Sequence, residues 1–413
     1  MAMRALTVPG LLDMSKTLPL SHLTVLDLAG ESGRFCGRLL AALGAHVIRV
    51  EKPGGDGTRC QPPFVKNRAG SKNSLPLWFN NAGKLSITLN LLTQQGRSLL
   101  RRLARTADVL VETFPPGYLK RKRLDYGSLA TINPRLIVAS ITGFGQTGPH
   151  SHFLSNDLVS AAAGGQMYVS GPVDGTPLKM YGEQSFFFAS LYAVGAIMLA
   201  LQERWRSNLG QHIDISLQEV VASSLTEVMA GYFGQNEITR RMGNIHRAEA
   251  AANFPCRDGW IFITFGSEWD TLVDWMDSEG MAGHLKDGIW QDTAYRRRNA
   301  GYVVRTISRW TERHTMNDLF ETAQRMRFPW APLRSLCDLP SNPQLLERGF
   351  FAGVKKGGNN KDLLFPGLPL GIAEMTGQSF RIAAAGENNY MIYHDELGIP
   401  VKQLARWERA GII

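Results

Sequence analysis

The sequence predicts an α/β protein with a mostly parallel, doubly wound sheet, and three observations lead to this prediction. Short apolar strands alternate with amphipathic segments along the first third of the chain. Glycine supplies 42 of the 413 residues, above the usual share of about 7%, as is typical of chains with many strand-to-helix turns. The length itself predicts two to three domains at roughly 150 residues each.

Each element follows from a local pattern. Short runs rich in strand-forming residues predict strands at 23–28, 47–50, 85–91, 109–112, 136–140 and 212–216. Helical spacing predicts helices at 35–43, 96–107 and 183–206, another from Leu217 onward, and a polar one near 401–410. Gly44 ends the first helix. This alternation predicts parallel strands joined by helices.

A change of composition after about Gly231 predicts a second domain. Residues 235–250 are polar and basic, and the segment CRDGWIFITF then predicts a hairpin around Asp258 and Gly259. Two or three amphipathic helices follow, through about Met326. We therefore expect a small inserted α+β domain at 232–330. Residues 1–231 and 331–413 would form the large Rossmann-like domain.

Charge and composition narrow the function. A net charge of +9 indicates an acidic partner, such as nucleic acid, a membrane surface or a phosphorylated small molecule. The basic clusters at 120–123 and 296–298 contain no interleaved aromatic residues, which argues against a nucleic-acid partner. The longest apolar run, 191–201, is too short for the ~20 residues of a membrane span. We expect neither nucleic acid nor membrane as a partner.

Metal and redox patterns point to a cytoplasmic chain without a metal site. The four cysteines are single, with no CxxC, and the nine histidines show no ligand spacing. The N-terminal segment has no sustained apolar core of the kind that a secretory signal requires. A reduced, cytoplasmic protein is the simplest interpretation.

The turn after the first strand contains Gly30, Gly33 and Gly37 but not the G-x-G-x-x-G of dinucleotide sites. Glu31 also puts a negative charge where a pyrophosphate would bind, although Glu51 stands where a ribose-binding acid would be. We favour close helix–strand packing as the role of these glycines. No G-x-S-x-G signature indicates a serine hydrolase.

The whole chain from Leu20 onward resembles the class III (CaiB/BaiF-type) CoA-transferase family. The resemblance rests on segments in a fixed order, including LDLAGESGRFCGRLLAALGAHVIRVEKPGGDGTR, SITLNLLTQQGR, VETFPPGYLKR, SITGFGQTGP, LGQHIDISLQEVV and SNPQLLERGFF. It implies a Rossmann-like large domain made from both chain ends, an inserted small domain, and two interlocked subunits. The implied reaction moves CoA from an acyl-CoA to a free carboxylate, with the CoA thioester as a substrate and no further cofactor.

Matching the motifs residue by residue implies a CoA-binding set. Lys52 matches a basic contact to the nucleotide, and Leu89 lies in the strand that lines the adenine site. Phe114 lies in the VETFPPG turn, and Arg121 occupies the basic position after it. Arginine binds phosphate in a bidentate manner while apolar side chains flank adenine, so these residue types suit CoA.

The sequence departs from the family at the nucleophile. The family uses an aspartate before the long helix, and gapless matching places Phe186 at that position. Glu183, three residues upstream, is the nearest carboxylate; it is either a substitute nucleophile or a cap of the helix N-terminus. The G-H-D triplet of related racemases is Ser155-Asn156-Asp157 here, which argues against racemase chemistry. In the loop after the first strand, where the family's transferases have a glutamine, this chain has Glu31.

These departures predict a subunit without its own nucleophile. The segment YGEQSFFFASLYA and the altered triplet resemble the subunit that lacks the aspartate in heteromeric members of the family. This resemblance implies that a paralogous CoA-transferase subunit supplies the carboxylate, that succinyl-CoA is the donor, and that an acid such as (R)-benzylsuccinate is the acceptor. Two alternatives remain open: a self-sufficient homodimeric acyl-CoA:carboxylate CoA-transferase that uses Glu183, and a non-catalytic CoA-binding subunit.

Overall fold

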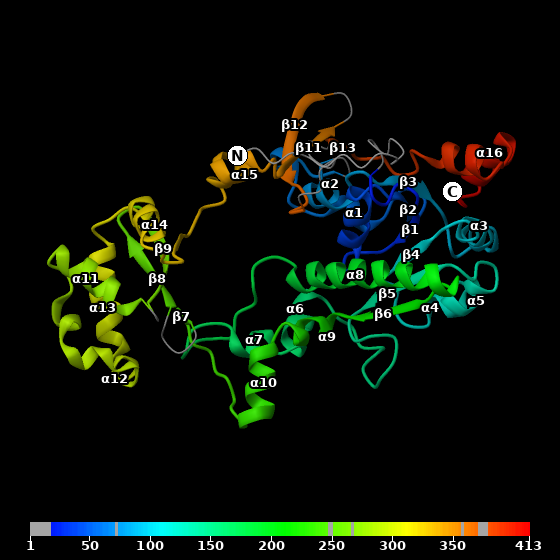
Figure 1. The fold of residues 1–413 in the computed structure, drawn as a ribbon. Coiled ribbons are helices and arrows are strands. Elements are labelled where there is room, and N and C mark those ends of the chain that lie inside the picture. Colours follow the sequence, from blue (N-terminus) through cyan, green and yellow to red (C-terminus); the bar gives the residue numbers. More distant parts are fainter. Residues whose placement is uncertain (1–17, 71–72, 247–250, 266–267, 357–358, 371–378) are drawn as a thin grey trace, which may run out of the picture. The chain divides into compact units, whose positions relative to one another are not determined.

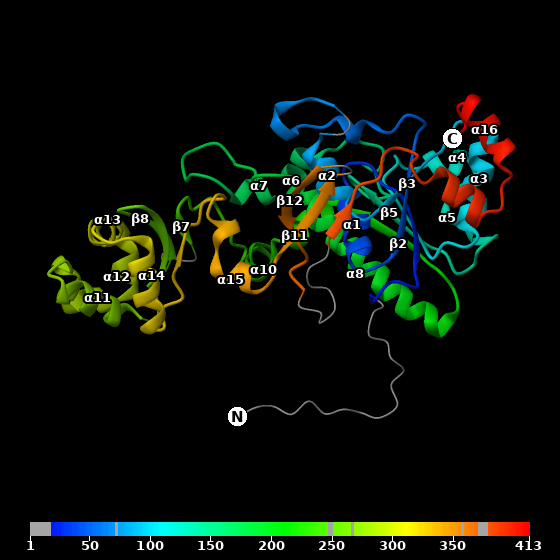
Figure 2. The same cartoon turned by 90° about the horizontal axis from the view of Figure 1, so that it is seen from above.

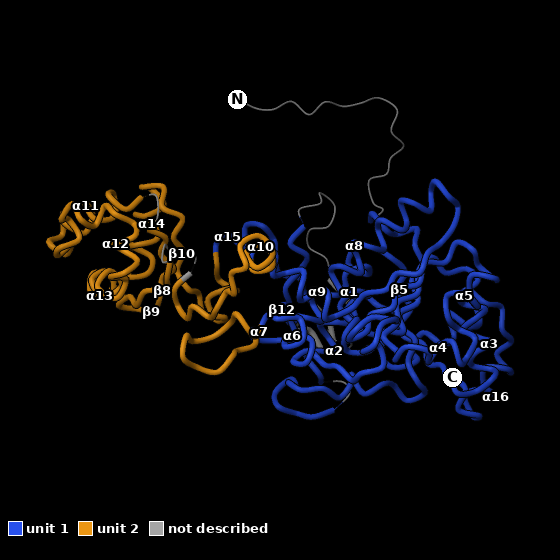
Figure 3. The backbone as a smooth tube through the Cα atoms, turned by 90° about the horizontal axis from the view of Figure 1, so that it is seen from below, with its two compact units in different colours: residues 1–166, 180–227, 343–413 blue, residues 167–179, 228–342 orange. Residues whose placement is uncertain are grey.

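The structure is a computed structural model, which describes residues 18–70, 73–246, 251–265, 268–356, 359–370 and 379–413. It divides the chain into two compact units (Figure 3). Unit 1 comprises residues 1–166, 180–227 and 343–413, and unit 2 comprises 167–179 and 228–342.

Unit 1 contains a six-stranded parallel sheet (Figure 1). Its strands are β1 (Thr24–Leu28), β2 (His46–Glu51), β3 (Leu85–Thr88), β4 (Val109–Glu112), β5 (Ile137–Thr142) and β6 (His212–Ser216). They lie in the order β3-β2-β1-β4-β5-β6, and every neighbouring pair is parallel. The predicted α/β fold is confirmed. The strand order reverses between β1 and β4, where such sheets form a ligand crevice outside their carboxyl ends.

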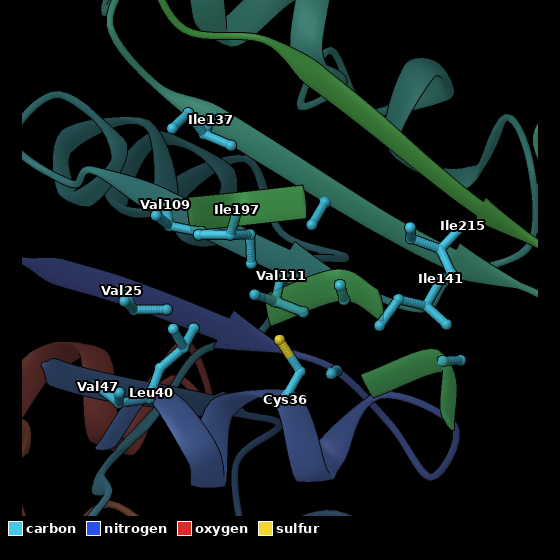
Figure 4. Packing of buried hydrophobic residues seen from close by; sticks show 14 of the residues in the cluster. Val25, Cys36, Leu40, Val47, Val109, Val111, Ile137, Ile141, Ile197 and Ile215 are labelled. Carbon is cyan, nitrogen blue, oxygen red and sulfur yellow. The ribbon is translucent and has the colours of Figure 1, made fainter. Parts of the chain in front are cut away.

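One face of the sheet is covered by α1 (Arg34–Ala42), α8 (Gln184–Ser207) and α9 (Leu217–Ser223). Figure 4 shows this packing: Cys36 and Leu40 of α1 meet the strand residues Val25 and Val111, and Ile197 of α8 joins the same cluster. The three helices therefore share one apolar core with the strands.

The opposite face carries α3 (Gln94–Ala104), α5 (Tyr126–Ala130), a helical turn at Met391–Glu396 and α16 (Val401–Arg409). In Figure 2 these C-terminal elements lie beside α3 and α5. Ile392 and Leu404 pack among the leucines of α3. The last residues of the chain thus complete the large unit, as the family resemblance implies.

Helix α8 is long and apolar enough to cross a membrane by length and composition alone. The expectation that no segment approaches a membrane span was therefore wrong on composition. The residues Ala189, Ala193 and Ile197 are nevertheless fully buried against the sheet. This face of the helix packs in a protein core, which is the other common origin of an apolar helix, while Leu191, Leu199 and Trp205 of the same helix are exposed.

Unit 2 has its own core around an antiparallel sheet. The sheet orders β10 (Ala331–Pro332), β9 (Gly259–Thr264), β8 (Ala251–Cys256) and β7 (Ile245–His246), and the predicted hairpin is β8–β9. Four helices accompany it, where two or three were expected: α11 (Trp269–Ser278), α12 (Thr293–Arg298), α13 (Ala300–Thr311) and α14 (Met316–Arg325).

Unit 2 also extends beyond the 232–330 expected for the inserted domain. Ala331 and Pro332 pair with Phe262 and Ile261 of β9, so the chain stays in this unit after residue 330. Residues 167–179 join it as well, because Gly243 donates a backbone hydrogen bond to the Gly171 carbonyl. Such long-range pairings do not change the local composition, so the sequence did not indicate these boundaries.

Unit 1 contains a second sheet, and the chain contains several short helices, that were not predicted from the sequence. A three-stranded sheet in unit 1 orders β12 (Asn359–Pro366), β11 (Phe351–Lys356) and β13 (Ser379–Arg381). Further short helices are α2 (Leu75–Asn81), α4 (Tyr118–Arg121), α6 (Asp157–Ala163), α7 (Gln166–Val169), α10 (Thr226–Gln235) and α15 (Pro343–Glu347).

Candidate functional site: two adjoining cavities

A cavity of about 590 Å³ opens at the carboxyl ends of β1 to β4. We call it the strand-end cavity. Its lining comes from the segments that follow these strands: Ala29 to Glu31, Glu51 and Lys52, Leu89 to Leu92, and Thr113 to Phe114. The cavity lies at the reversal of strand order, and its size is within the roughly 300–1,000 Å³ of small-molecule and cofactor sites.

Three of the four residues expected to bind CoA line this cavity: Lys52, Leu89 and Phe114. Arg121, in α4, is not among its described lining residues. Tyr118, which the sequence analysis did not identify, stacks on Phe114 with ring centroids 4.6 Å apart and 19° between the planes. This pair presents an apolar, flat wall of the kind that binds a purine ring.

Glu51, which lines the strand-end cavity, belongs to a network of buried ion pairs. Both carboxylate oxygens of Glu51 accept hydrogen bonds from Arg59, at 2.7 and 2.5 Å. Lys84 Nζ donates to Asp27 Oδ2 at 2.6 Å, and both side chains are fully buried. Burial lowers the pKa of Lys84 to about 8. Because Glu51 is occupied by Arg59, it does not present a free carboxylate to a ribose.

The glycines of the first turn serve close packing, as predicted. The Gly30 N–H donates to Thr113 Oγ1 at 2.7 Å. A side chain at Gly33 would put its Cβ 2.8 Å from the Thr113 methyl group, a distance that real Cβ atoms do not adopt. The turn therefore needs glycine to bring α1 against β4.

A second cavity, of about 280 Å³, adjoins the first and shares Glu31 with it. We call it the Arg34 cavity. Its lining includes Arg34 and Phe35 of α1, Phe79 and Asn80 of α2, and Glu183, Gln184, Phe186, Phe187 and Ser190 at the start of α8. Its volume lies just below the usual range for drug-sized ligands, so it suits an acyl or aryl group rather than a nucleotide.

Polar side chains connect the two cavities. Gln61, in the lining of the strand-end cavity, donates from its amide to Glu31 Oε1 at 2.8 Å and accepts from Arg34. The other arm of the Arg34 guanidinium reaches Glu183 Oε2 at 2.7 Å. Arg34 therefore links Glu183 by hydrogen bonds to Gln61 in the lining of the strand-end cavity.

Glu183 is the N-cap residue of α8, but its side chain makes no capping hydrogen bond. The carboxylate of Asp157 fills that role instead by accepting the Ser185 N–H at 2.9 Å. Of the two roles left open for Glu183, a side-chain hydrogen bond that caps the helix is contradicted, because Asp157 already accepts the Ser185 N–H. The aspartate of the Ser155-Asn156-Asp157 triplet is buried and is engaged in this cap.

Phe186 lies in the first turn of α8 and is buried in the core cluster while it also lines the Arg34 cavity. The first turn of α8 contains no acidic residue. The position that the family resemblance assigns to the nucleophile thus carries a hydrocarbon ring at the cavity wall.

A third group of polar residues lies below the Phe114 turn. Glu112 accepts the Phe114 N–H at 2.6 Å, and burial raises the pKa of Glu112 to about 7, with a Ser140 hydrogen bond acting in the opposite direction. Ser140 Oγ also lies 3.0 Å from His212 Nε2. Burial lowers the pKa of His212. Glu112 thus supports the turn that carries Phe114.

Comparison with known proteins identifies the family of the chain. Residues 20–386 match CoA-transferase family III. The chain is 33% identical over 403 residues to the succinyl-CoA:(R)-benzylsuccinate CoA-transferase subunit BbsE of Thauera aromatica, covering 95% of this chain and 98% of the relative. It is 35% identical over 338 residues to the succinate–glutarate CoA-transferase of Agrobacterium fabrum, covering 80% and 84% of the two chains.

A solved structure is similar as well. A CaiB/BaiF family protein from Brucella suis superposes with a TM-score of 0.82 at 30% sequence identity, covering 92% of this chain and all of the other. The agreement in fold extends over nearly the whole chain.

Proposed function

Since the chain belongs to CoA-transferase family III, we propose that it moves CoA from succinyl-CoA to a carboxylic acid such as (R)-benzylsuccinate, as the subunit without a nucleophile in a heteromer. The observation that carries the proposal is Phe186, which stands at the wall of the Arg34 cavity where the family's aspartate is expected. The similarity to a subunit of a benzylsuccinate CoA-transferase supports both the acceptor and the partner.

The strand-end cavity would hold the nucleotide end of CoA. Phe114 and Leu89 offer apolar surfaces for adenine, and Lys52 is exposed at the rim, where it would meet a phosphate. CoA thioesters are substrates in this proposal, and no further cofactor takes part. The free thiols of Cys36, Cys60, Cys256 and Cys337 suit the reducing cytoplasm, which we propose as the location.

The proposed chemistry needs a carboxylate from the partner. That carboxylate attacks the succinyl-CoA carbonyl, the C–S bond breaks, and CoA thiolate leaves a mixed anhydride behind. The thiolate then attacks the partner's carbonyl and releases succinate, which leaves CoA as a thioester of the partner. The acceptor carboxylate repeats the two steps in reverse and leaves as its own CoA thioester.

The test is a CoA-exchange assay with the pure chain and with the chain co-expressed with candidate paralogous subunits. We expect no exchange by the pure chain, and exchange once a partner with an aspartate nucleophile is present. Co-purification of the tagged chain identifies that partner. Turnover by the pure chain that Glu183→Gln abolishes would overturn the dependent-subunit proposal.

A second candidate is a self-sufficient homodimeric acyl-CoA:carboxylate CoA-transferase that uses Glu183. It is favoured by the position of this carboxylate in the Arg34 cavity. Hydroxylamine trapping of a glutamyl-CoA adduct at Glu183 distinguishes the two, because the leading proposal expects no such adduct. Calorimetric binding of CoA without exchange under any partner condition would instead indicate a non-catalytic CoA-binding subunit.

A further inference from the structure

The Arg34 cavity contains a polar atom without a partner. Ser190 lies on the second turn of α8, is fully buried, and lines the cavity. Its hydroxyl oxygen has no hydrogen-bond partner among the described residues. A buried hydroxyl left unpaired costs about 1–3 kcal/mol, so a cavity wall with such a group is suited to a ligand that supplies the missing hydrogen bond.

The cavity also holds an arginine whose charge is neutralised by an exchangeable group. The Arg34 side chain is only 7% exposed, whereas the side chain of its partner Glu183 is 45% exposed. The Arg34 pair is the one ion pair of Glu183 within the described residues, and its carboxylate does not cap α8. Glu183 can therefore rotate into water without breaking another side-chain hydrogen bond or ion pair among the described residues, while Arg34 remains in the cavity.

The remaining wall is aromatic. Phe35 stacks on Phe187 with centroids 4.7 Å apart and on Phe79 with centroids 5.6 Å apart. These rings come from three helices, α1, α2 and α8, and all three line the cavity. Offset stacks of this kind favour a further aromatic ring beside them by about 0.5–1.5 kcal/mol beyond burial.

From these three features we infer that the Arg34 cavity binds an aryl-substituted dicarboxylic acid, whose non-reacting carboxylate takes the place of Glu183 on Arg34. The inference rests on the proposed function, and it assigns the acceptor to particular residues. The phenylalanine rings hold the aryl group, and the Ser190 hydroxyl donates to a carboxylate oxygen. Glu183 is then an internal stand-in for the substrate carboxylate rather than the nucleophile.

The charges of the cavity explain why Glu183 must leave Arg34 when a substrate carboxylate binds. Glu31 and Glu183 both line the cavity around the single guanidinium of Arg34, so the free cavity is net negative. Glu31 is held by Gln61, while Glu183 is the carboxylate bonded to Arg34. A second carboxylate enters favourably only when Glu183 gives up its place, so Glu183 competes with the acid.

The test measures binding of benzylsuccinate to the full chain by calorimetry, in the presence of CoA. 4-Phenylbutan-1-ol, which keeps the ring but has no carboxylate, and succinate, which lacks the ring, are the comparison probes. Removal of the competing charge by Glu183→Gln should tighten benzylsuccinate binding about tenfold, a change equivalent to about 1.4 kcal/mol. It should leave 4-phenylbutan-1-ol binding nearly unchanged, because this probe has no carboxylate to take the place of Glu183.

Glu203→Gln is the matched control. Glu203 is also a glutamate of α8 paired with an arginine, Arg206, at 2.8 Å, but it lies near the other end of the helix. It should leave all three affinities unchanged. Arg34→Gln should weaken benzylsuccinate binding about tenfold or more while CoA binding persists, since a charge-assisted pair is lost.

The outcomes separate this inference from the proposed function. Unchanged or weaker benzylsuccinate binding by the Glu183→Gln chain, with CoA still bound, overturns the inference and leaves CoA transfer standing. If the unmodified chain does not bind CoA, the proposed function is contradicted instead. Because Glu183→Gln alters a half-exposed side chain and predicts a gain, a folding defect cannot imitate the expected result.

Discussion

The two adjoining cavities differ in how their charges are held. Glu51 of the strand-end cavity belongs to a buried network in which Lys84 is paired with Asp27 and Arg59 with Glu51. In the Arg34 cavity, the pair is half exposed, because Glu183 faces water. Buried pairs fix the shape of a site since breaking them strands a charge, whereas a half-exposed pair can exchange one partner for a ligand. The comparison predicts a rigid strand-end cavity, proposed for the nucleotide, beside an adjustable Arg34 cavity, proposed for the acid.

The largest expected effect tests the rigidity of this buried network of ion pairs. Lys84→Met would leave Asp27 buried without its main partner, and we expect the free energy of unfolding to fall by about 3–5 kcal/mol. Urea denaturation followed by circular dichroism measures it. Lys402→Met, at an exposed lysine of α16, is the control. A loss below about 1 kcal/mol for Lys84→Met would show that the buried network does not depend on this pair.

The contribution of Glu112, which holds the Phe114 turn, to the stability of the protein should depend on pH. Burial raises the pKa of Glu112 from 4.5 to about 7, so the folded chain retains a proton that the unfolded chain releases as the pH rises from about 4.5 to 7. Stability therefore declines across this window, and the cost is complete above it. Glu112→Gln keeps an acceptor for Phe114 without this cost.

We expect Glu112→Gln to stabilise the protein at pH 8 by roughly 2 kcal/mol and to give no gain at pH 4. Thermal unfolding of both proteins across this range is the measurement. A stability difference that stays constant with pH would contradict the explanation, because only titration of Glu112 makes it pH-dependent.

A smaller effect concerns the aromatic wall of the strand-end cavity. Phe114→Ala removes the ring that stacks on Tyr118, and the lost aromatic contact should weaken CoA binding about threefold to tenfold. Calorimetry with CoA measures this change. Phe153→Ala removes an exposed ring that lines neither cavity. If both variants bind CoA alike, the strand-end cavity is not the nucleotide site.

The smallest expected effect is the stability change of Glu183→Gln. A half-exposed ion pair contributes about 1 kcal/mol or less, and salt reduces it further. The free energy of unfolding should thus fall far less than for Lys84→Met, and the difference should shrink at high salt. A loss comparable to that of Lys84→Met would remove the contrast between the two cavities.

Much of the fold could be predicted because its signals are local. The strands at 109–112 and 212–216 match β4 and β6 residue for residue, and 183–206 matches α8 within one residue at each end. Short apolar runs with clear punctuation carry this information in their own residues. The family resemblance extended it to Lys52, Leu89 and Phe114, which the fold brings to one cavity.

Contacts between distant segments were decided only by the tertiary structure. No local pattern pairs β10 with β9, caps α8 with Asp157, or places Arg34 against Glu183, 149 positions away. The aromatic row of Phe35, Phe79 and Phe187 also joins three helices. The sequence alone predicted the strands of the large sheet and its helices, because the spacing and the type of their residues are local signals. It also showed that position 186 is a phenylalanine. The partners of each side chain depended on packing, since burial and charge pairing arise only when remote segments meet.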